Sequence, residues 1–115
     1  NHGNMERDFT YIDDIVEGVI RIIEKPPVKR IETNELYKVY NIGNNNSVKL
    51  LDFIKEIEFN LDKVAAKNMM EMQPGDVERT WADVDELIKD YDYSPNTSIK
   101  DGVKSFINWF KSYYN

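Results

Sequence analysis

The apolar residues of this chain recur at helical spacing in four stretches, and this pattern constrains the fold more than any other feature. Three of the stretches are long, over 13–25, 49–62 and 99–113, and a shorter one covers 84–91. Residues three and four positions apart share one face of a helix. The Pro-Pro pair at 26–27 ends the first stretch, because proline cannot continue a helix. The chain is therefore expected to be mostly helical.

Only two runs favour strands. Residues 7–12 and 36–42 are rich in aromatic and β-branched residues. The polar residues 28–35 predict a surface loop, the Gly-Asn-rich residues 43–47 break the second run, and residues 64–72 are ambiguous between extended and irregular chain. Two strands hardly form a stable sheet alone. We therefore expect a small α/β unit, mostly helical with a few short strands, whose sheet partners lie elsewhere in a longer protein.

Turn and cap signals separate these elements. Residues 73–77, Gln-Pro-Gly-Asp-Val, predict a tight turn, because Pro and Gly together determine its dihedral angles. Asp83 is a candidate N-cap for the short helix. Ser98 and Asp101 have the spacing of a weak capping box at the start of the last helix.

Composition limits the class of protein. The chain has 115 residues, enough for one domain with a modest core, and we treat 1–115 as a single domain. Its net charge is -6, with Lys and Arg scattered among acids. This pattern argues against nucleic-acid binding, although a well-placed cation can still bind a small anion.

The same composition bears on the compartment. No apolar run approaches the ~20 residues of a membrane span, and the polar start shows no signal peptide. Cysteine is absent, which excludes a disulfide framework and a thiolate zinc site. We therefore expect a cytoplasmic protein without membrane contact.

Arg7 is the strongest candidate for a binding residue. It is a fixed cation in a strand-prone run that leads directly into an acidic helix start. A guanidinium presents a rigid fork of donors that matches phosphate oxygens better than an ammonium group does. On the residues alone, the alternative is a surface arginine paired with Asp8 or Asp13.

Two patterns of dinucleotide enzymes are missing. The chain has neither a Gly-rich dinucleotide loop nor a Tyr-x-x-x-Lys pair. We interpret it as part of an enzyme whose chemistry is encoded upstream of residue 1, and we expect no turnover from these 115 residues alone. No catalytic, cofactor-binding or metal-ligating residue is assigned within it. Trp81 and Trp109 are expected to be core or domain-contact residues.

Four segments stand out together in the sequence. They are RDFTYIDDI at 7–15, YNIGNNNSVKLLDFI at 40–54, MQPGDVERTWADVDEL at 72–87 and TSIKDGVKSFINWFKSYY at 97–114. In this order and spacing, they resemble the C-terminal part of the extended short-chain dehydrogenase/reductase family. That family includes nucleotide-sugar epimerases and dehydratases, and within it the four segments are most similar to bacterial UDP-glucuronate 4-epimerases.

The resemblance implies a division of labour. An upstream Rossmann domain would bind NAD and carry the catalytic Tyr, Lys and Ser/Thr, while the C-terminal part closes over the diphosphate of a UDP-sugar. The implied reaction is C4 epimerisation: hydride passes from C4 to NAD, leaves a 4-keto intermediate and returns to the opposite face, with the cofactor supplying the chemistry.

The resemblance also implies a pathway and an oligomeric state, and it leaves alternative functions open. It implies a role in polysaccharide biosynthesis and a full-length homodimer formed through the upstream half. The alternatives are a sibling UDP-glucose 4-epimerase or nucleotide-sugar 4,6-dehydratase, or a free-standing binding module without catalysis.

The resemblance implies substrate-binding roles for several residues, each with a structural alternative. It assigns Arg7 to the diphosphate, Asn41 and Phe9 to the vicinity of the nucleotide, and Asp76 to the ribose hydroxyls. The alternatives are a turn residue that caps its own backbone for Asn41, core packing for Phe9, and fixing of the turn for Asp76.

Gln73 departs from the family pattern. Several relatives place a second phosphate-binding arginine there. A glutamine still donates two hydrogen bonds but brings no charge, so it remains a substrate-binding candidate of a weaker kind. Whether Arg79 replaces the missing cation is left open.

Overall fold

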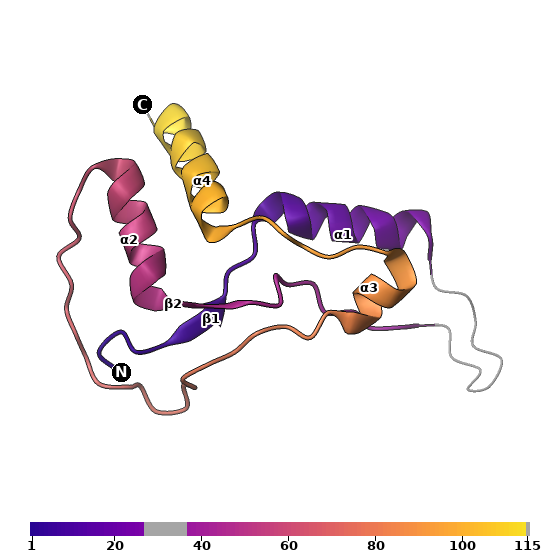
Figure 1. Cartoon of the computed structure of the whole chain (residues 1–115), viewed down its shortest axis with the longest axis horizontal. Helices are drawn as coiled ribbons and strands as arrows, with labels where there is room; N and C mark the ends of the chain where they lie inside the picture. The colour runs from indigo at the N-terminus through magenta and orange to yellow at the C-terminus, as the bar shows by residue number, and fades with distance from the viewer. Residues whose placement is uncertain (27–36, 115) are drawn as a thin grey trace.

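The computed structural model describes residues 1–26 and 37–114, and in these ranges it contains four helices and two short strands. Figure 1 shows α1 and α3 at one end of the molecule and α2 beside α4 at the other, with the two strands at the foot of α2. The expected small α/β unit is confirmed. In chain order the elements are β1 (Glu6–Asp8), α1 (Ile12–Glu24), β2 (Ser47–Lys49), α2 (Leu50–Leu61), α3 (Asp85–Tyr91) and α4 (Ile99–Tyr113).

The four helices agree with the apolar periodicity to within one residue at each end. Their caps differ in one detail. Ser98 caps α4 as expected, because its hydroxyl accepts a hydrogen bond from the Asp101 N–H at 3.1 Å. The N-cap of α3 is Val84 instead of Asp83. Asp83 still contributes from one position earlier, since its carboxylate accepts from the Asp85 N–H at 3.1 Å.

The strands differ more from expectation. β1 is shorter than the expected 7–12, because Tyr11 is already the N-cap of α1. The expected strand at 36–42 is wrong over its described residues 37–42, which form no ladder. Their side chains instead reach α3, as described below. β2 begins at Ser47, the last residue of the expected break, and ends at Lys49, where the second helix was expected to begin. The expected loop at 28–35 lies outside the described residues.

Residues 64–72, which the sequence leaves ambiguous, are irregular in the structure. The Glu58 carboxylate of α2 holds their first part, because it accepts from the Ala65 N–H at 2.8 Å and from the Lys67 ammonium. These bonds lower the pKa of Glu58, the lysine contributing most. The segment therefore returns along α2 before it reaches the turn at 73–77.

The strands form a narrow ladder at the centre. β1 pairs with β2 in antiparallel register, with Arg7 opposite Val48. On its other edge β1 runs parallel to a short segment: the Glu6 N–H donates to the Glu78 carbonyl at 2.8 Å, and the Thr80 N–H donates to the Glu6 carbonyl at 3.3 Å. β1 therefore lies between two segments that are distant in sequence.

The buried core is small and divided. Leu87 and Val84 are fully buried beside Tyr91 at the α1–α3 end, whereas Val103 and Ile107 are buried where α4 packs on α2. At the first end, the Tyr91 hydroxyl donates to the Lys25 carbonyl at 3.1 Å and so ties α3 to the end of α1.

Much apolar surface remains exposed. Ile12 and Ile23 of α1 are 61% and 72% exposed. Trp81 and Trp109 are also more than half exposed, so the core interpretation of these tryptophans is wrong and domain contact stays a prediction. The radius of gyration is 17.8 Å, above the ~13 Å expected for a compact chain of this length. The described elements therefore do not cover their own apolar faces.

The Ser98 cap is expected to stabilise α4. Ser98→Ala should lower the free energy of unfolding by about 1 kcal/mol, because the Asp101 N–H loses its acceptor. Urea denaturation of both proteins measures the difference. Ser105→Ala is the matched control, since Ser105 is exposed within the same helix; equal stability of the two variants would contradict the capping role.

Candidate functional site

The site begins at the ladder edge, where Arg7 meets Asp76. Arg7 Nη2 donates to Asp76 Oδ1 at 2.6 Å, across 69 residues of sequence. Arg7 Nη1 donates to the Glu6 carbonyl at 2.8 Å and to that of Glu78 at 3.4 Å. The two side chains are 28% and 37% exposed. The structure thus brings together the two residues expected to bind diphosphate and ribose, on a guanidinium whose direction is fixed by backbone carbonyls.

The turn that carries Asp76 forms as predicted. The Asp76 N–H donates to the Gln73 carbonyl at 3.2 Å, and Gly75 has a φ of 83°, a value that favours glycine. Asp76 Oδ1 also accepts from the Val77 N–H at 2.8 Å, so its carboxylate does stabilise the turn. The Gln73 side chain is exposed and forms no hydrogen bond within the described part of the chain.

Arg79 lies on the other face of the ladder. Its Nε donates to Ser47 Oγ at 2.8 Å and pairs with the Glu6 carboxylate at 2.9 Å. Its guanidinium carbon also lies above the ring of Trp81, 4.9 Å from the ring centre. Successive side chains of a strand point to opposite faces of the sheet, so the side chains of Glu6 and Arg7 lie on opposite faces of the ladder. The structure does not bring Arg79 beside Arg7.

Asn41 follows the irregular stretch that faces α3. Its amide Nδ2 donates to the Asp83 carbonyl at 3.1 Å, and its side chain is otherwise exposed. It therefore links two segments that are 42 residues apart in sequence. It does not form a hydrogen bond with Arg7 or Asp76 in this structure.

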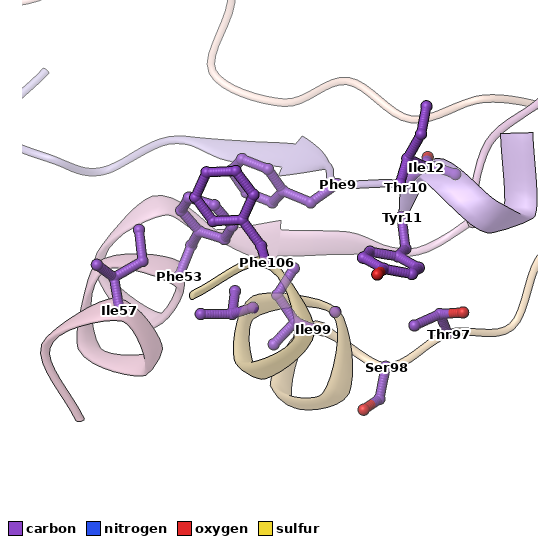
Figure 2. Close-up of a pocket in the computed structure, with 12 residues that line it drawn as sticks. Phe9, Thr10, Tyr11, Ile12, Phe53, Ile57, Thr97, Ser98, Ile99 and Phe106 are labelled. Carbon is purple, nitrogen blue, oxygen red and sulfur yellow. The ribbon is translucent and has the colours of Figure 1, made fainter. Parts of the chain in front are cut away.

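Phe9 lies in an apolar pocket instead of at the Arg7–Asp76 pair. Its ring stacks on Phe53 of α2, with centres 4.1 Å apart and planes within 2° of parallel. Figure 2 shows Phe9, Phe53 and Phe106 grouped between the end of β1 and helices α2 and α4. The pocket has a volume of about 440 Å³, and its contacts match the packing alternative for Phe9.

Sequence reasoning missed the role of Asp8, which it considered only as an ion-pair partner for Arg7. Asp8 Oδ1 accepts from the Asn44 N–H at 2.9 Å, and Oδ2 accepts from the N–H groups of Asn45 and Ala82, each at 3.1 Å. The sequence contains only indirect indications of this role: an acid at the end of a short strand, and a Gly-Asn-Asn loop with exposed backbone N–H groups. Nothing in the sequence indicates that this acid binds that loop.

A second polar cluster joins residues 37–40 to α3. Asp90 accepts from Lys38 Nζ at 2.5 Å and from the Tyr40 hydroxyl at 2.7 Å, while Glu86 lies 3.5 Å from Lys38. Hydrogen bonding to Lys38, then to Tyr40, lowers the pKa of Asp90. The bond to Asp90 raises the pKa of Lys38, and burial is the main cause that raises the pKa of Tyr40. This cluster is structural, since it fixes the extended stretch against α3.

The Asp90 cluster predicts a pH dependence of stability. Because the pKa of Asp90 is lowered by folding, its contribution is present above about pH 4 and disappears as the pH falls through the lowered value. Asp90→Asn should therefore flatten the acidic limb of the unfolding free energy against pH, measured by urea denaturation. Asp85→Asn, an exposed carboxylate of the same helix, should keep the wild-type slope. Equal slopes in wild type and Asp90→Asn would contradict the assignment.

Within residues 1–26 and 37–114, no three acidic or histidine side chains are grouped so as to hold a metal ion. In the same ranges, no helix has the length and apolar character needed to cross a bilayer.

Comparison with known sequences identifies relatives of this chain. The model of the family described as GDP-mannose 4,6 dehydratase matches residues 1–106. The chain is 49% identical over 124 residues to Protein CapI of Staphylococcus aureus, covering 99% of this chain and 37% of that protein. It is 34% identical to the probable UDP-glucuronate 4-epimerase of Rhizobium meliloti, covering 97% of this chain and 36% of that protein. The chain thus spans little more than a third of these relatives.

Solved structures share the arrangement of elements. UDP-glucuronic acid 4-epimerase from Bacillus cereus, in complex with UDP-glucuronic acid and NAD, superposes with a TM-score of 0.80 at 34% identity, covering 97% of this chain and 34% of that one. UDP-glucose 4-epimerase from Thermotoga maritima has a TM-score of 0.81 at 20% identity, covering 100% of this chain and 34% of that one. The second likeness shows a common fold alone.

Proposed function

Because this chain belongs to the GDP-mannose 4,6 dehydratase family, a group of extended short-chain dehydrogenases/reductases that includes nucleotide-sugar epimerases, we propose that it is the UDP-sugar-binding part of a UDP-glucuronate 4-epimerase. The observation that carries the proposal is the Arg7–Asp76 pair, 2.6 Å apart. A cation for a diphosphate and an acceptor for ribose hydroxyls are thereby adjacent, as one nucleotide requires.

The Arg7 guanidinium has the geometry for a phosphate ligand. Two backbone carbonyls hold Nη1, whereas Nε donates no hydrogen bond within the described residues. A phosphate oxygen could therefore bind at the Nε and Nη2 edge, in the paired geometry that guanidinium favours. Since the direction of the fork is already fixed, little side-chain freedom is lost when the ligand binds.

Asp76 supports the ribose side of the same site. Only its Oδ1 accepts hydrogen bonds among the described residues, from Arg7 and Val77. Oδ2 is thus available to a sugar hydroxyl. A diphosphate that replaces Asp76 at Nη2 of Arg7 would release Oδ1 as well, so the two ligand contacts support each other. Asn41, Gln73 and Phe9 remain weaker proposals for the same ligand, because their present contacts lie away from the pair.

The sugar is proposed from the relatives. Relatives named as UDP-glucuronate 4-epimerases are 32–35% identical to this chain over nearly its whole length. The UDP-glucose 4-epimerase structures reach only 20% and 23% identity, which supports the fold and not the substrate. A sibling UDP-glucose epimerase or a 4,6-dehydratase is therefore the second candidate.

The residues of this chain do not fit a dinucleotide site of their own. No Gly-rich loop follows a strand in the sequence, and β1 and β2 lead into α1 and α2 without one. We therefore assign NAD to an upstream Rossmann part of the full-length enzyme, which also carries the catalytic residues. The exposed apolar residues of α1 and the half-exposed Trp109 support such a partner, because they would pack on it.

Three further features of the proposal rest on the family alone. We place the enzyme in the cytoplasm, as a homodimer formed through its upstream half, with a product used in polysaccharide synthesis.

A substrate panel tests the proposed function. The full-length protein, supplied with NAD, should convert UDP-glucuronate to its C4 epimer and should turn over UDP-glucose and dTDP-glucose at least tenfold more slowly. Preference for UDP-glucose, or loss of water from dTDP-glucose, would favour the second candidate. UDP binding without turnover of any of the three would favour a binding module.

The isolated chain gives a separate expectation. The 115 residues alone should show no epimerisation of UDP-glucuronate with NAD, because the dinucleotide loop and the Tyr-x-x-x-Lys pair are missing from their sequence. Chromatographic separation of the two epimers measures this directly. Detectable product from the pure chain would contradict the assignment of the chemistry to the upstream part.

A further inference from the structure

Asp8 lies where three chain segments that carry the proposed site meet. It follows Arg7 at the end of β1. Its carboxylate accepts hydrogen bonds from the loop after Asn41, through the N–H groups of Asn44 and Asn45 at 2.9 and 3.1 Å. It also accepts from Ala82, six residues beyond Asp76, at 3.1 Å. One side chain therefore connects the segments of three of the proposed ligand-binding residues, Arg7, Asn41 and Asp76.

This junction requires a side chain with acceptors on both of its terminal atoms. Three backbone N–H groups donate to the two carboxylate oxygens, and an ionised carboxylate offers acceptors only. Asn45 has a φ of 50°, in the left-handed region. Such a backbone turn presents consecutive N–H groups to one anion. An amide at position 8 would place an NH₂ group against at least one of these donors.

Gly43 allows the segments to approach this closely. A Cβ atom added to it would lie 2.5 Å from Ala82 Cβ and 2.8 Å from Asp8 Oδ2. Both distances are too short for a side chain to fit without movement of the backbone. A second link, from Asn41 Nδ2 to the Asp83 carbonyl at 3.1 Å, holds the same two segments together.

We propose that Asp8 is a positioning residue for nucleotide-sugar binding, which holds the segments of Asn41 and Asp76 in place relative to Arg7. The inference rests on the proposed function. Asp8 does not contact the ligand in this scheme; it acts through the backbone. Its loss should displace the binding groups, and a displacement of about 1 Å can reduce efficiency by roughly a hundredfold.

The test compares kinetic constants of full-length Asp8→Asn and wild type. The KM for UDP-glucuronate and the Kd for UDP should each rise at least tenfold, while the Kd for NAD stays within twofold. A purely structural role would lower the fraction of active protein, and hence the apparent kcat, with KM and Kd unchanged. That result would overturn the proposal.

Three further variants make the outcome unambiguous. Gly43→Ala disturbs the same junction by a different route and should also raise KM; if Asp8→Asn does not fold, an unchanged KM in Gly43→Ala overturns the inference. Asp62→Asn is the matched control, since Asp62 has a left-handed φ of 53° at the end of α2, which Asn accepts. Arg7→Ala distinguishes failure of the proposed function from failure of this inference. An unchanged KM and Kd in Arg7→Ala would contradict the proposed function. A raised KM in Arg7→Ala with an unchanged KM in Asp8→Asn would contradict only the role of Asp8.

Discussion

Replacement of Arg7 by alanine is expected to weaken UDP-sugar binding by about 1.5–3 kcal/mol, which corresponds to roughly a ten- to hundredfold rise in Kd. The reason is the loss of charged hydrogen bonds to the diphosphate. Arg79 is engaged by Ser47 and Glu6 on the other face of the ladder, so it is not expected to take the place of Arg7. Calorimetric titration of the full-length enzyme with UDP measures the change, and steady-state kinetics should show it as a raised KM.

Two variants accompany Arg7→Ala. Arg7→Lys keeps the charge but loses the planar fork, so its Kd should lie between those of wild type and Arg7→Ala. Lys104→Ala removes an exposed cation from α4 and should leave binding unchanged. An unchanged KM and turnover in Arg7→Ala would remove Arg7 from the site.

The second large effect is expected on stability. Leu87 is fully buried on α3, beside the equally buried Val84. Leu87→Ala should lower the free energy of unfolding by about 2–5 kcal/mol, because the lost apolar contacts add to the cost of the cavity. Since single domains are stable by only about 5–15 kcal/mol, much of the folded population could be lost.

The neighbouring residue provides the control for Leu87. Ile88 is 38% exposed on the same helix, so Ile88→Ala removes a similar side chain from a less confined place. Urea denaturation should show a clearly smaller loss for Ile88→Ala. Equal losses in the two variants would contradict the placement of the core at Leu87.

The helices could be predicted from sequence because their signals are local. Apolar spacing and proline gave the bounds of α1 to within one residue, and Ser98 caps α4 as its spacing with Asp101 indicates. Strand pairing is not local. Residues 37–42 have strand-like side chains but no neighbour to pair with in the described chain, whereas Ser47–Lys49 pairs with β1 despite its polar sequence.

The site shows the same division. Arg7 and Asp76 could be proposed from their motifs, but their 2.6 Å contact joins residues that are distant in sequence, so it depends on the parallel pairing of β1 with residues 78–80. Asp8 could not be distinguished from any other surface acid, because three of its partners are backbone N–H groups, which every residue except proline possesses. The N–H groups that bind Asp8 come together only in the folded chain, where the loop after Gly43 lies against Ala82.

The Arg7–Asp76 contact also bears on how the site would respond to ionic strength. If Arg7 binds the diphosphate as proposed, one anion replaces another at the same guanidinium. Added salt screens the contact that is broken as well as the contact that forms, so the two effects partly cancel. Affinity would then vary less with salt than at an unpaired arginine. Free phosphate, which has no ribose to occupy the released carboxylate, would be a poor competitor for the intact nucleotide.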